Sequence, residues 1–409
     1  MPIDRLLEVV DQHVADLEGQ GTAKGAEVVV SRVVGPKGDE GPRFFLEGEG
    51  DRPFIRMNAN SYLGMSLNPD VIQAEEETTK AFGAGPGAVR FIAGSYTHHI
   101  QLEEALAAFH GREAGMIFSS AYAAVVGTLT SLIDGNTLVL SDELNHNCII
   151  NAMRLARPAA KSIYPHLALD VLDQQLESGK GTARRALVVT DGIFSMRGDH
   201  APVDEIMEIA ARHDSGYPEN VVVIVDDSHG VGAFGATGRG TEEHTGSAPS
   251  DVLLGTLGKA FGVNGGYVVG PAGLTRFLRE TAPMYIYSNP ITPGEASAAL
   301  KAIEILDSAQ GLALLDHLRT LTKRFATGLV ALGLEVIPGE HPVVPLMVRE
   351  TARTRSLVDQ LFAAGVLATG LTYPVVPKGD EEIRFQVNAD HTEADIDYVL
   401  GVLAEAAAA

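Results

Sequence analysis

Short apolar runs alternate with helical stretches between about residue 60 and residue 290, and this alternation restricts the fold more than any other feature. The runs lie at residues 116–118, 137–140, 186–190, 221–225, 252–254 and 267–269. Nearly continuous Val, Ile and Leu runs between helices are typical of strands that are buried on both faces of a mostly parallel sheet. We therefore predict an α/β fold whose large domain has a mostly parallel central sheet covered by helices.

The flanking stretches predict two further units. Residues 3–17 carry apolar side chains at helical spacing, and residues 35–53 are rich in Gly, Pro and charge, so 1–59 should hold an N-terminal helix and an extended segment. After about residue 295, helical stretches surround short apolar runs at 343–347 and 383–387. The predicted division is 1–59, a large domain at 60–294 and a smaller α+β C-terminal domain at 295–409.

The composition excludes several classes of function. The chain has 31 Lys and Arg residues against 53 Asp and Glu, a formal net charge of −22, which disfavours a nucleic-acid partner and adsorption to an anionic membrane. Cys148 is the single cysteine, so a disulfide framework and a Cys-rich metal site are excluded, and no metal site is predicted. Neither a bilayer-spanning apolar run nor a signal-peptide pattern is present, so a cytoplasmic protein is expected.

Lys259 lies in a Gly-punctuated turn just after the run at 252–254. Such a lysine has three interpretations: a solvated cation, a phosphate-binding P-loop lysine, or a buried amine that forms a Schiff base with a cofactor aldehyde. The P-loop pattern requires Gly where Leu253 stands and Ser or Thr where Ala260 stands, so it is excluded. The choice between the other two depends on the rest of the chain.

Ligands bind beyond the carboxyl ends of parallel strands, so the residues after each run are the candidates for a site. After the first run, Ser120 opens a helix at Ala121 and Tyr122, where amides and hydroxyls suit a phosphate, although a plain capped helix has the same pattern. His146 follows the second run. It is a buried histidine, a metal ligand or a ring stacked on a planar cofactor.

Two further runs also end in polar residues. One leads into a turn that carries Ser195, and the other leads into Asp226, with His229 three residues on. The Asp226 carboxylate could bind a ribose, bind a metal or hold a proton on a pyridine nitrogen, and the glycine pattern that a ribose site requires is absent. Phosphate donors, a flat imidazole, an acid and an amine at one sheet edge are what pyridoxal 5'-phosphate requires. We therefore predict that Lys259 binds the aldehyde of this cofactor.

Several motifs also resemble those of the α-oxoamine synthases, in the fold-type I group of pyridoxal phosphate-dependent transferases. The matching stretches are residues 60–64 (NSYLG), 89–94 (VRFIAG) with His99, 141–146 (SDELNH), 190–196 (TDGIFSM), 225–232 (VDDSHGVG), 238–240 (GRG), 255–259 (GTLGK) and 373–379 (YPVVPKG). The resemblance extends from Asn60 to His391. The match at 370–379 and 382–392 is most similar to the glycine C-acetyltransferase branch of the family.

The resemblance implies roles for individual residues. Lys259 would carry the cofactor, Asp226 would pair with its pyridine nitrogen, and His146 would stack on its ring. The other cofactor contacts implied are Ser195 and His229 near the phenolic oxygen and, at the phosphate, Ser120, Ala121, Tyr122, Thr256 and the neighbouring subunit's Ser288. Asn60 and Arg384 would hold the carboxylate of the amino acid substrate.

The reaction implied is acyl transfer to carbon in a homodimer with a shared active site. Glycine, or another small amino acid, would condense with an acyl-CoA thioester, for which acetyl-CoA is expected, and the thiol would leave. Lys259 would take the α-proton. The alternatives are a longer acyl-CoA or carrier-protein thioester, as in 8-amino-7-oxononanoate, 5-aminolevulinate or serine palmitoyl synthesis or in secondary metabolism, and a fold-type I aminotransferase.

Overall fold

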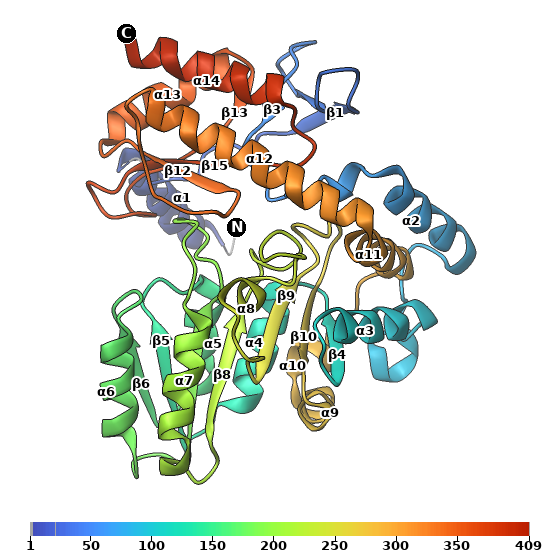
Figure 1. Ribbon diagram of the computed structural model, residues 1–409, viewed down its shortest axis with the longest axis vertical. Coiled ribbons are helices and arrows are strands. Elements are labelled where there is room, and N and C mark those ends of the chain that lie inside the picture. Colours follow the sequence, from blue (N-terminus) through green and yellow to red (C-terminus); the bar gives the residue numbers. More distant parts are fainter. Residues whose placement is uncertain (1–2, 21, 409) are drawn as a thin grey trace.

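The computed structural model describes residues 3–20 and 22–408 and contains the predicted central sheet (Figure 1). In spatial order its seven strands are β4 (Ala114–Phe118), β10 (Gly266–Gly270), β9 (Val252–Thr256), β8 (Val221–Asp226), β7 (Arg185–Asp191), β5 (Thr137–Asp142) and β6 (Ala160–Tyr164). Neighbouring strands are parallel, except that β10 is antiparallel to both β4 and β9. The predicted α/β class with a mostly parallel sheet is confirmed.

Helices cover both faces of this sheet, which explains the continuous apolar runs. On β7, Val188 faces one hydrophobic cluster, whereas Leu187 and Val189 face the other, and all three are at most 1% exposed. Alternate residues of a strand point to opposite faces, so a strand between two helical layers must be apolar at every position. The helices of this region are α2 (Pro69–Phe82), α3 (Thr97–Phe109), α4 (Ala121–Leu132), α5 (Asn147–Ala156), α6 (Leu169–Gly179), α7 (Val203–His213), α8 (Thr241–Thr245), α9 (Ala272–Thr281), α10 (Pro283–Ile286) and α11 (Pro293–Leu306).

The edge strand β6 was not predicted. It reads Ala-Lys-Ser-Ile-Tyr, and only Tyr164 is buried, while Ala160, Lys161 and Ile163 are exposed. An edge strand pairs on one side only and here buries little apolar surface, so its sequence lacks the run that marks the inner strands.

A second sheet lies above the first and is antiparallel. Its order is β11 (Glu335–Val336), β12 (Val343–Met347), β15 (Glu382–Gln386) and β14 (Thr369–Leu371), and it is accompanied by α12 (Ala309–Ala331), α13 (Thr351–Ala363) and α14 (Glu393–Ala408). At the start of α14, Thr392 and Asp395 cap each other, since each backbone N–H donates to the other side chain at 3.0 and 3.1 Å. This is the predicted smaller α+β layer.

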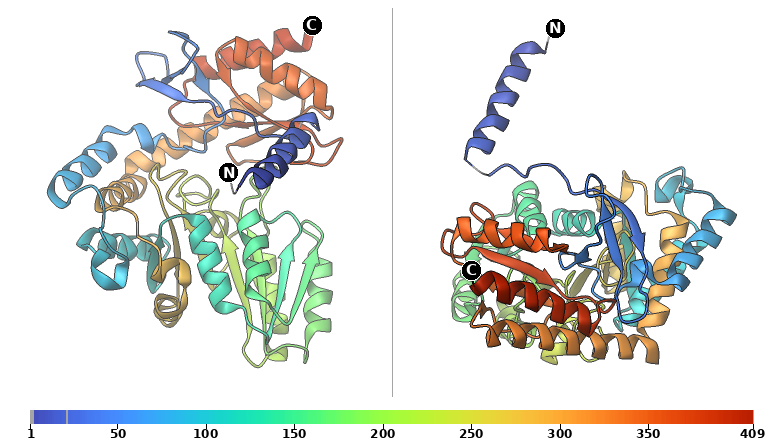
Figure 2. Two further views of the ribbon diagram at one scale, coloured as in Figure 1. Left: turned by 180° about the vertical axis from the view of Figure 1, so that it is seen from behind. Right: turned by 90° about the horizontal axis from the view of Figure 1, so that it is seen from above.

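The N-terminal segment joins that upper layer. The short strand β3 (Ile55–Arg56) pairs in parallel with β13 (Val366–Leu367), and β1 (Val30–Val34) pairs with β2 (Arg43–Leu46). Helix α1 (Asp4–Gly19) has no buried residue and projects from the rest of the chain (Figure 2, right). The division of the chain at residues 59 and 294 remains a prediction.

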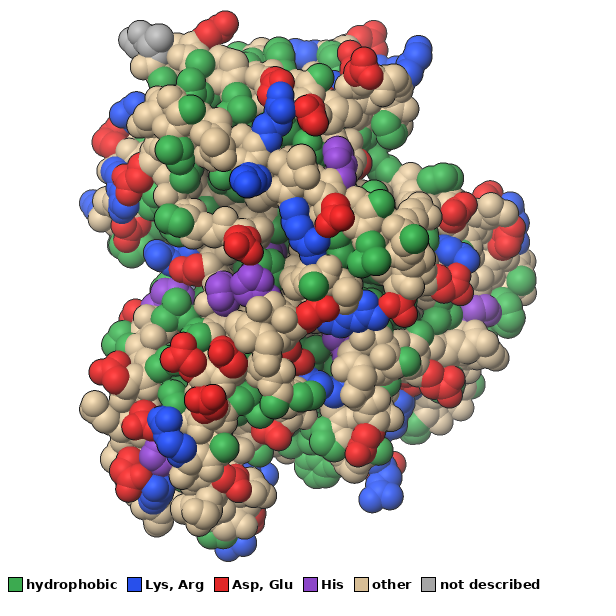
Figure 3. All heavy atoms as spheres, viewed as in Figure 1, with side chains coloured by type: hydrophobic (Ala, Val, Ile, Leu, Met, Phe, Trp, Pro, Cys, Tyr) green, Lys and Arg blue, Asp and Glu red, His purple; other side chains and the backbone are tan. Residues whose placement is uncertain are grey.

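The surface agrees with a mixed, acidic composition. Acidic and basic side chains are interspersed over the face shown in Figure 3, and histidines gather where the upper and lower parts of the molecule meet. Of the helices in the described residues, none has the length and apolar character that crossing a membrane requires.

Candidate active site

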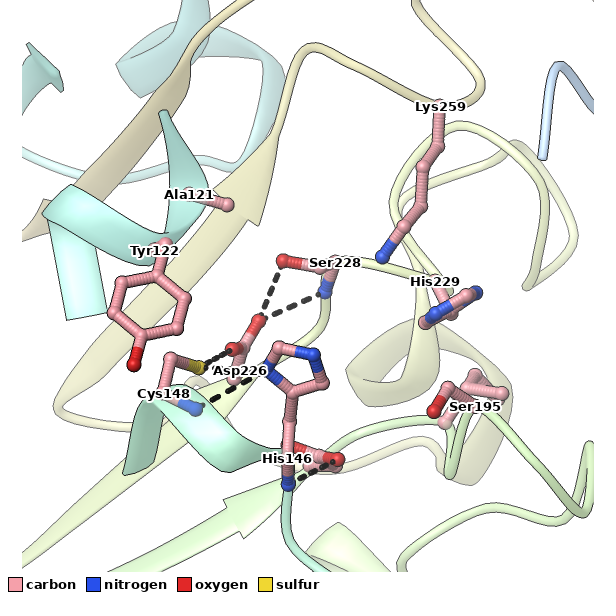
Figure 4. A pocket seen from close by; sticks show the side chains of 11 residues that line it. Ala121, Tyr122, His146, Cys148, Ser195, Asp226, Ser228, His229 and Lys259 are labelled. Carbon is pink, nitrogen blue, oxygen red and sulfur yellow. Dashed lines mark hydrogen bonds between the residues drawn. The ribbon is translucent and has the colours of Figure 1, made fainter. Parts of the chain in front are cut away.

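A cavity of about 370 Å³ lies beyond the carboxyl ends of the parallel strands (Figure 4). Loops that follow β4, β5, β7, β8 and β9 all contribute to it. The lining residues are Ala121, Tyr122, His146, Cys148, Asp191, Ile193, Ser195, Asp226, Ser228, His229 and Lys259. The strand-end rule therefore brought most of the predicted site residues into one space.

Lys259 reaches this cavity from the turn after β9. The turn closes through a hydrogen bond from the Gly262 N–H to the Lys259 carbonyl at 3.0 Å, and Gly262 has a φ of 71°. A side chain at Gly262 would meet the Ser66 backbone nitrogen at 2.3 Å, so glycine is required. Burial lowers the pKa of the Lys259 amine to about 8, although the negative charge of Asp226 acts in the opposite sense. An amine with this pKa is partly neutral near pH 7 and can attack a carbonyl carbon.

Asp226, the last residue of β8, lies opposite the lysine and is 6% exposed. Its Oδ1 accepts hydrogen bonds from the Ser228 backbone N–H at 3.2 Å and from the Ser228 hydroxyl at 2.6 Å. Its Oδ2 faces the Cys148 thiol at 3.7 Å. Burial and the neighbouring Asp226 raise the pKa of that thiol well above its usual value, so Cys148 is a neutral side chain beneath the carboxylate.

His146 is held at the start of α5 by bonds on both its backbone and its ring. Its N–H donates to Asp191 Oδ2 at 3.0 Å, and its Nδ1 accepts from the Cys148 N–H at 3.3 Å. Burial lowers the pKa of the His146 imidazole, with Lys259 acting in the same direction, so the ring is neutral and its face is free to stack. Figure 4 shows the ring at the floor of the space toward which the Lys259 amine points.

Asp191 is a site residue that the sequence analysis missed. It is 4% exposed and its Oδ1 has no hydrogen-bond partner, while burial and the charge of Asp226 raise its pKa well above the usual value. A signal was present, because Asp191 ends β7 as Asp226 ends the neighbouring β8, and the two residues are paired in register.

His229 belongs to a chain of hydrogen bonds that enters from the N-terminal segment. The Tyr62 hydroxyl lies 2.7 Å from His229 Nδ1 and 3.3 Å from Asn60 Oδ1, and Tyr62 is fully buried. Burial and the charge of Lys259 hold the pKa of His229 well below its usual value, so its ring is neutral. Asn60 is therefore connected to the cavity through Tyr62, which the sequence analysis did not single out.

The start of α4 forms the other end of the cavity. The Ser120 hydroxyl caps this helix by accepting from the Ala123 N–H at 3.1 Å, and the Thr256 hydroxyl accepts from the Gly258 N–H at 3.1 Å. Between them, a side chain at Gly266 would lie 2.3 Å from the Ala121 backbone nitrogen. Strand β10 thus packs directly against the helix start, whose first amides and positive dipole end favour an anion.

Arg384 and Ser288 do not line the cavity within one chain. Arg384, on β15, reaches its rim and donates from Nη1 to the Ser195 carbonyl at 2.8 Å. Ser288 is half-buried, and its hydroxyl bonds only the neighbouring Asn289 carbonyl at 3.4 Å. The adjacent Tyr287 is 80% exposed.

These groups fit pyridoxal phosphate. The half-buried Lys259 amine, with its lowered pKa, suits the cofactor's aldehyde, and the Asp226 carboxylate suits its pyridine nitrogen. The flat, neutral ring of His146 suits stacking on the cofactor ring. The first amides of α4 suit its phosphate.

Known proteins agree with this chemistry. The family described as aminotransferase class I and II matches residues 52–403. The chain is 38% identical to 2-amino-3-ketobutyrate coenzyme A ligase of Bos taurus, over 96% of this chain and 90% of that protein. It is 39% identical to 8-amino-7-oxononanoate synthase of Symbiobacterium thermophilum, over 89% of this chain and 90% of that protein. Its structure resembles serine palmitoyltransferase of Sphingomonas wittichii with a TM-score of 0.88 and 26% identity, covering 99% of this chain and 97% of that one.

The extent and level of these matches show the family, and the site supplies the groups that its cofactor needs. The chain belongs to the aminotransferase class I and II family, as a pyridoxal phosphate-dependent acyltransferase of the α-oxoamine synthase group.

Proposed function

We propose that this enzyme condenses glycine, or another small amino acid, with an acyl-CoA thioester and releases the thiol. The single observation that carries the proposal is that Arg384 reaches the rim of the cavity that holds Lys259, through its bond to Ser195. An amine for the cofactor and a guanidinium for a carboxylate are what an amino acid substrate requires. The motif resemblance favours acetyl-CoA as the donor, and the 38% identity to 2-amino-3-ketobutyrate coenzyme A ligase supports a coenzyme A thioester.

We assign the cofactor contacts as follows. Lys259 would carry the cofactor, Asp226 would bond its pyridine nitrogen, His146 would stack on its ring, and Ser195 and His229 would lie toward its phenolic oxygen. The phosphate is held at the start of α4. The residues assigned there are Ser120, Ala121, Tyr122 and Thr256, together with Ser288 of a second copy of the chain.

When bound beside Lys259, pyridoxal phosphate would supply an electron sink that makes the α-proton of the amino acid acidic. Arg384 and Asn60 orient the amino acid by its carboxylate, and Lys259, with its lowered pKa, takes the proton at Nζ. Tyr62 holds the ring of His229 in place, and because this ring is neutral it adds no second positive charge beside Lys259.

The first test is thiol release. Purified enzyme loaded with pyridoxal phosphate is mixed with glycine and acyl-CoA, and free thiol is measured. We expect glycine-dependent release that is lost in Lys259→Ala, and a cofactor absorption band that changes in the same variant. Exchange of amino groups with keto acids without thiol release would instead establish an aminotransferase and refute the proposal.

A second part of the proposal is a homodimer with shared sites. Ser288 lies apart from the cavity of its own chain, beside the exposed Tyr287, and α1 exposes Leu6, Leu7 and Val10 without packing on its own chain. Mixing Lys259→Ala with Ser288→Asp chains tests this, because a shared site leaves one intact site in each hybrid dimer. Recovered activity supports sharing, whereas two inactive variants that stay inactive after subunit exchange contradict it.

A further inference from the structure

A second cavity adjoins the first one at Ser195, which lines both. It measures about 1060 Å³, including space that is open to solvent, and lies between the loops after β5 and β7 on one side and the upper sheet on the other. The proposed reaction needs space for two substrates, and the first cavity of about 370 Å³ holds the groups assigned to the cofactor. The second cavity is thus placed to receive a group that reacts beside Ser195.

Eight of the fifteen residues that line the second cavity are apolar. The apolar residues are Leu144, Phe194, Met196, Ile337, Met347, Val375, Val376 and Pro377. Apolar walls of this kind favour an aliphatic chain over a strongly hydrated group. An acetyl group would leave most of this space unfilled.

The basic residues of the second cavity already have partners. Arg197 donates to Asp199 at 2.7 Å, and Arg349 pairs with Glu335 at 2.6 Å and with Asp380 at 2.8 Å. Their charges are therefore balanced by carboxylates. A ligand carboxylate would have to compete with these carboxylates for either arginine.

Glu382 is the polar group of this cavity whose hydrogen-bonding capacity is not used. It lies two residues before Arg384 on β15, so both side chains extend from the same face of the strand. Glu382 is 3% exposed, and its Oε1 has no hydrogen-bond partner. A buried oxygen without a partner has lost its hydrogen bonds to water and has no protein bond in their place, which costs free energy. A ligand that donates a hydrogen bond to this oxygen recovers that free energy. Burial raises the pKa of this carboxyl to about 7, against the opposing charge of Arg384.

We propose that the second cavity receives the acyl chain of the thioester and that Glu382 selects chains with a hydrogen-bond donor over chains that end in a carboxylate. This inference rests on the proposed acyl transfer, and it replaces acetyl-CoA as the expected donor with a longer acyl-CoA whose chain carries a hydrogen-bond donor. A hydroxyl on the chain donates to Glu382 Oε1. A terminal carboxylate would instead face the carboxylates of Glu382 and Glu143, while the lining arginines Arg197 and Arg349 are already paired with other carboxylates.

The test compares donors of one chain length. Hexanoyl-CoA, ω-hydroxyhexanoyl-CoA and adipoyl-CoA, with acetyl-CoA as reference, are assayed by glycine-dependent thiol release with the holoenzyme. The variants are Glu382→Gln and Glu382→Leu, with Asp397→Asn as the control because Asp397 is an exposed carboxylate of the same layer, paired with Arg324. Ratios of kcat/KM between donors within one variant do not depend on how much protein is folded.

We expect the wild type to prefer the ω-hydroxy donor to hexanoyl-CoA by about tenfold or more, as for a hydrogen bond to a charged or buried acceptor, and to use adipoyl-CoA least. Glu382→Gln keeps an acceptor, so it retains the hydroxyl preference and relieves the penalty on adipoyl-CoA. Glu382→Leu loses the hydroxyl preference. Asp397→Asn leaves the order unchanged.

Two results overturn the inference. Equal use of hexanoyl-CoA and ω-hydroxyhexanoyl-CoA by the wild type shows that Glu382 does not bind the hydroxyl group of the acyl chain. An equal loss for all donors in Glu382→Leu, acetyl-CoA included, shows that Glu382 supports catalysis in general and does not select the acyl chain.

A calorimetric measurement separates failure of this inference from failure of the proposed reaction. Binding of the same thioesters to the holoenzyme without amino acid requires no turnover. If thiol is never released but ω-hydroxyhexanoyl-CoA still binds more tightly than hexanoyl-CoA, the reaction is wrong and the site stands.

Discussion

Replacing Lys259 with methionine is expected to stabilise the cofactor-free protein at neutral pH. Methionine keeps the length of the side chain but has no charge to bury. The pKa of Lys259 is about 8 in the folded chain against an ordinary 10.5, and this difference corresponds to about 3 kcal/mol of unfolding free energy. The native lysine therefore lowers stability by about this amount when it is protonated.

The stability advantage of Lys259→Met over the wild type should fall as the pH rises. Below pH 8 the amine is protonated in both the folded and the unfolded chain, so the full penalty applies and Lys259→Met has its largest advantage. As pH rises through 8, the folded amine loses its proton first and the penalty shrinks, and it vanishes above 10.5. We expect an advantage of about 3 kcal/mol at pH 7 that falls to roughly 1 kcal/mol near pH 9.5.

The assay is urea unfolding of both apoproteins at the two pH values, followed by circular dichroism. Lys323→Met is the control, because Lys323 is exposed on α12 and its replacement should change the stability by less than about 0.5 kcal/mol at either pH. Equal stability of Lys259→Met and the wild type at pH 7, or an advantage that does not fall with pH, would refute the assignment of a buried, destabilised amine.

Two further predictions concern the packing around the site. Gly266→Ala places a carbon 2.3 Å from the Ala121 backbone nitrogen, so it should lower the unfolding free energy by about 2–3 kcal/mol in thermal unfolding and weaken phosphate binding. The control is Gly273→Ala on α9, where the added carbon meets no atom within 4 Å, so this variant should be neutral or slightly stabilising. Tyr62→Phe removes the 2.7 Å hydrogen bond to His229, so it should cost about 1 kcal/mol in urea unfolding and raise the KM for the amino acid more than it lowers kcat; an unchanged KM would show that the Tyr62 contact does not position the site.

The inner strands and the residues at their ends could be predicted because a strand that is buried on both faces has a continuous run of apolar residues. The six predicted runs are all strands of the central sheet, and Lys259, Asp226 and His146 lie in one cavity at the carboxyl ends of the parallel strands. The strand β6 has no such run because most of its side chains are exposed. Ser288 cannot be placed by one chain at all, since its assigned role depends on a second copy.

The amino acid sequence by itself determined the covered parallel sheet, the lysine and the acid that face each other, and, through its motifs, the family. These are set by residues within one strand and the turn that follows it. The tertiary structure alone decided how the site is supported and what lies next to it. The Tyr62–His229 bond joins residues 167 positions apart, and Glu382 of the upper sheet lines one cavity together with Ser195 from the loop after β7. Which distant side chains meet depends on strand order and on how two layers pack, and no local pattern encodes that.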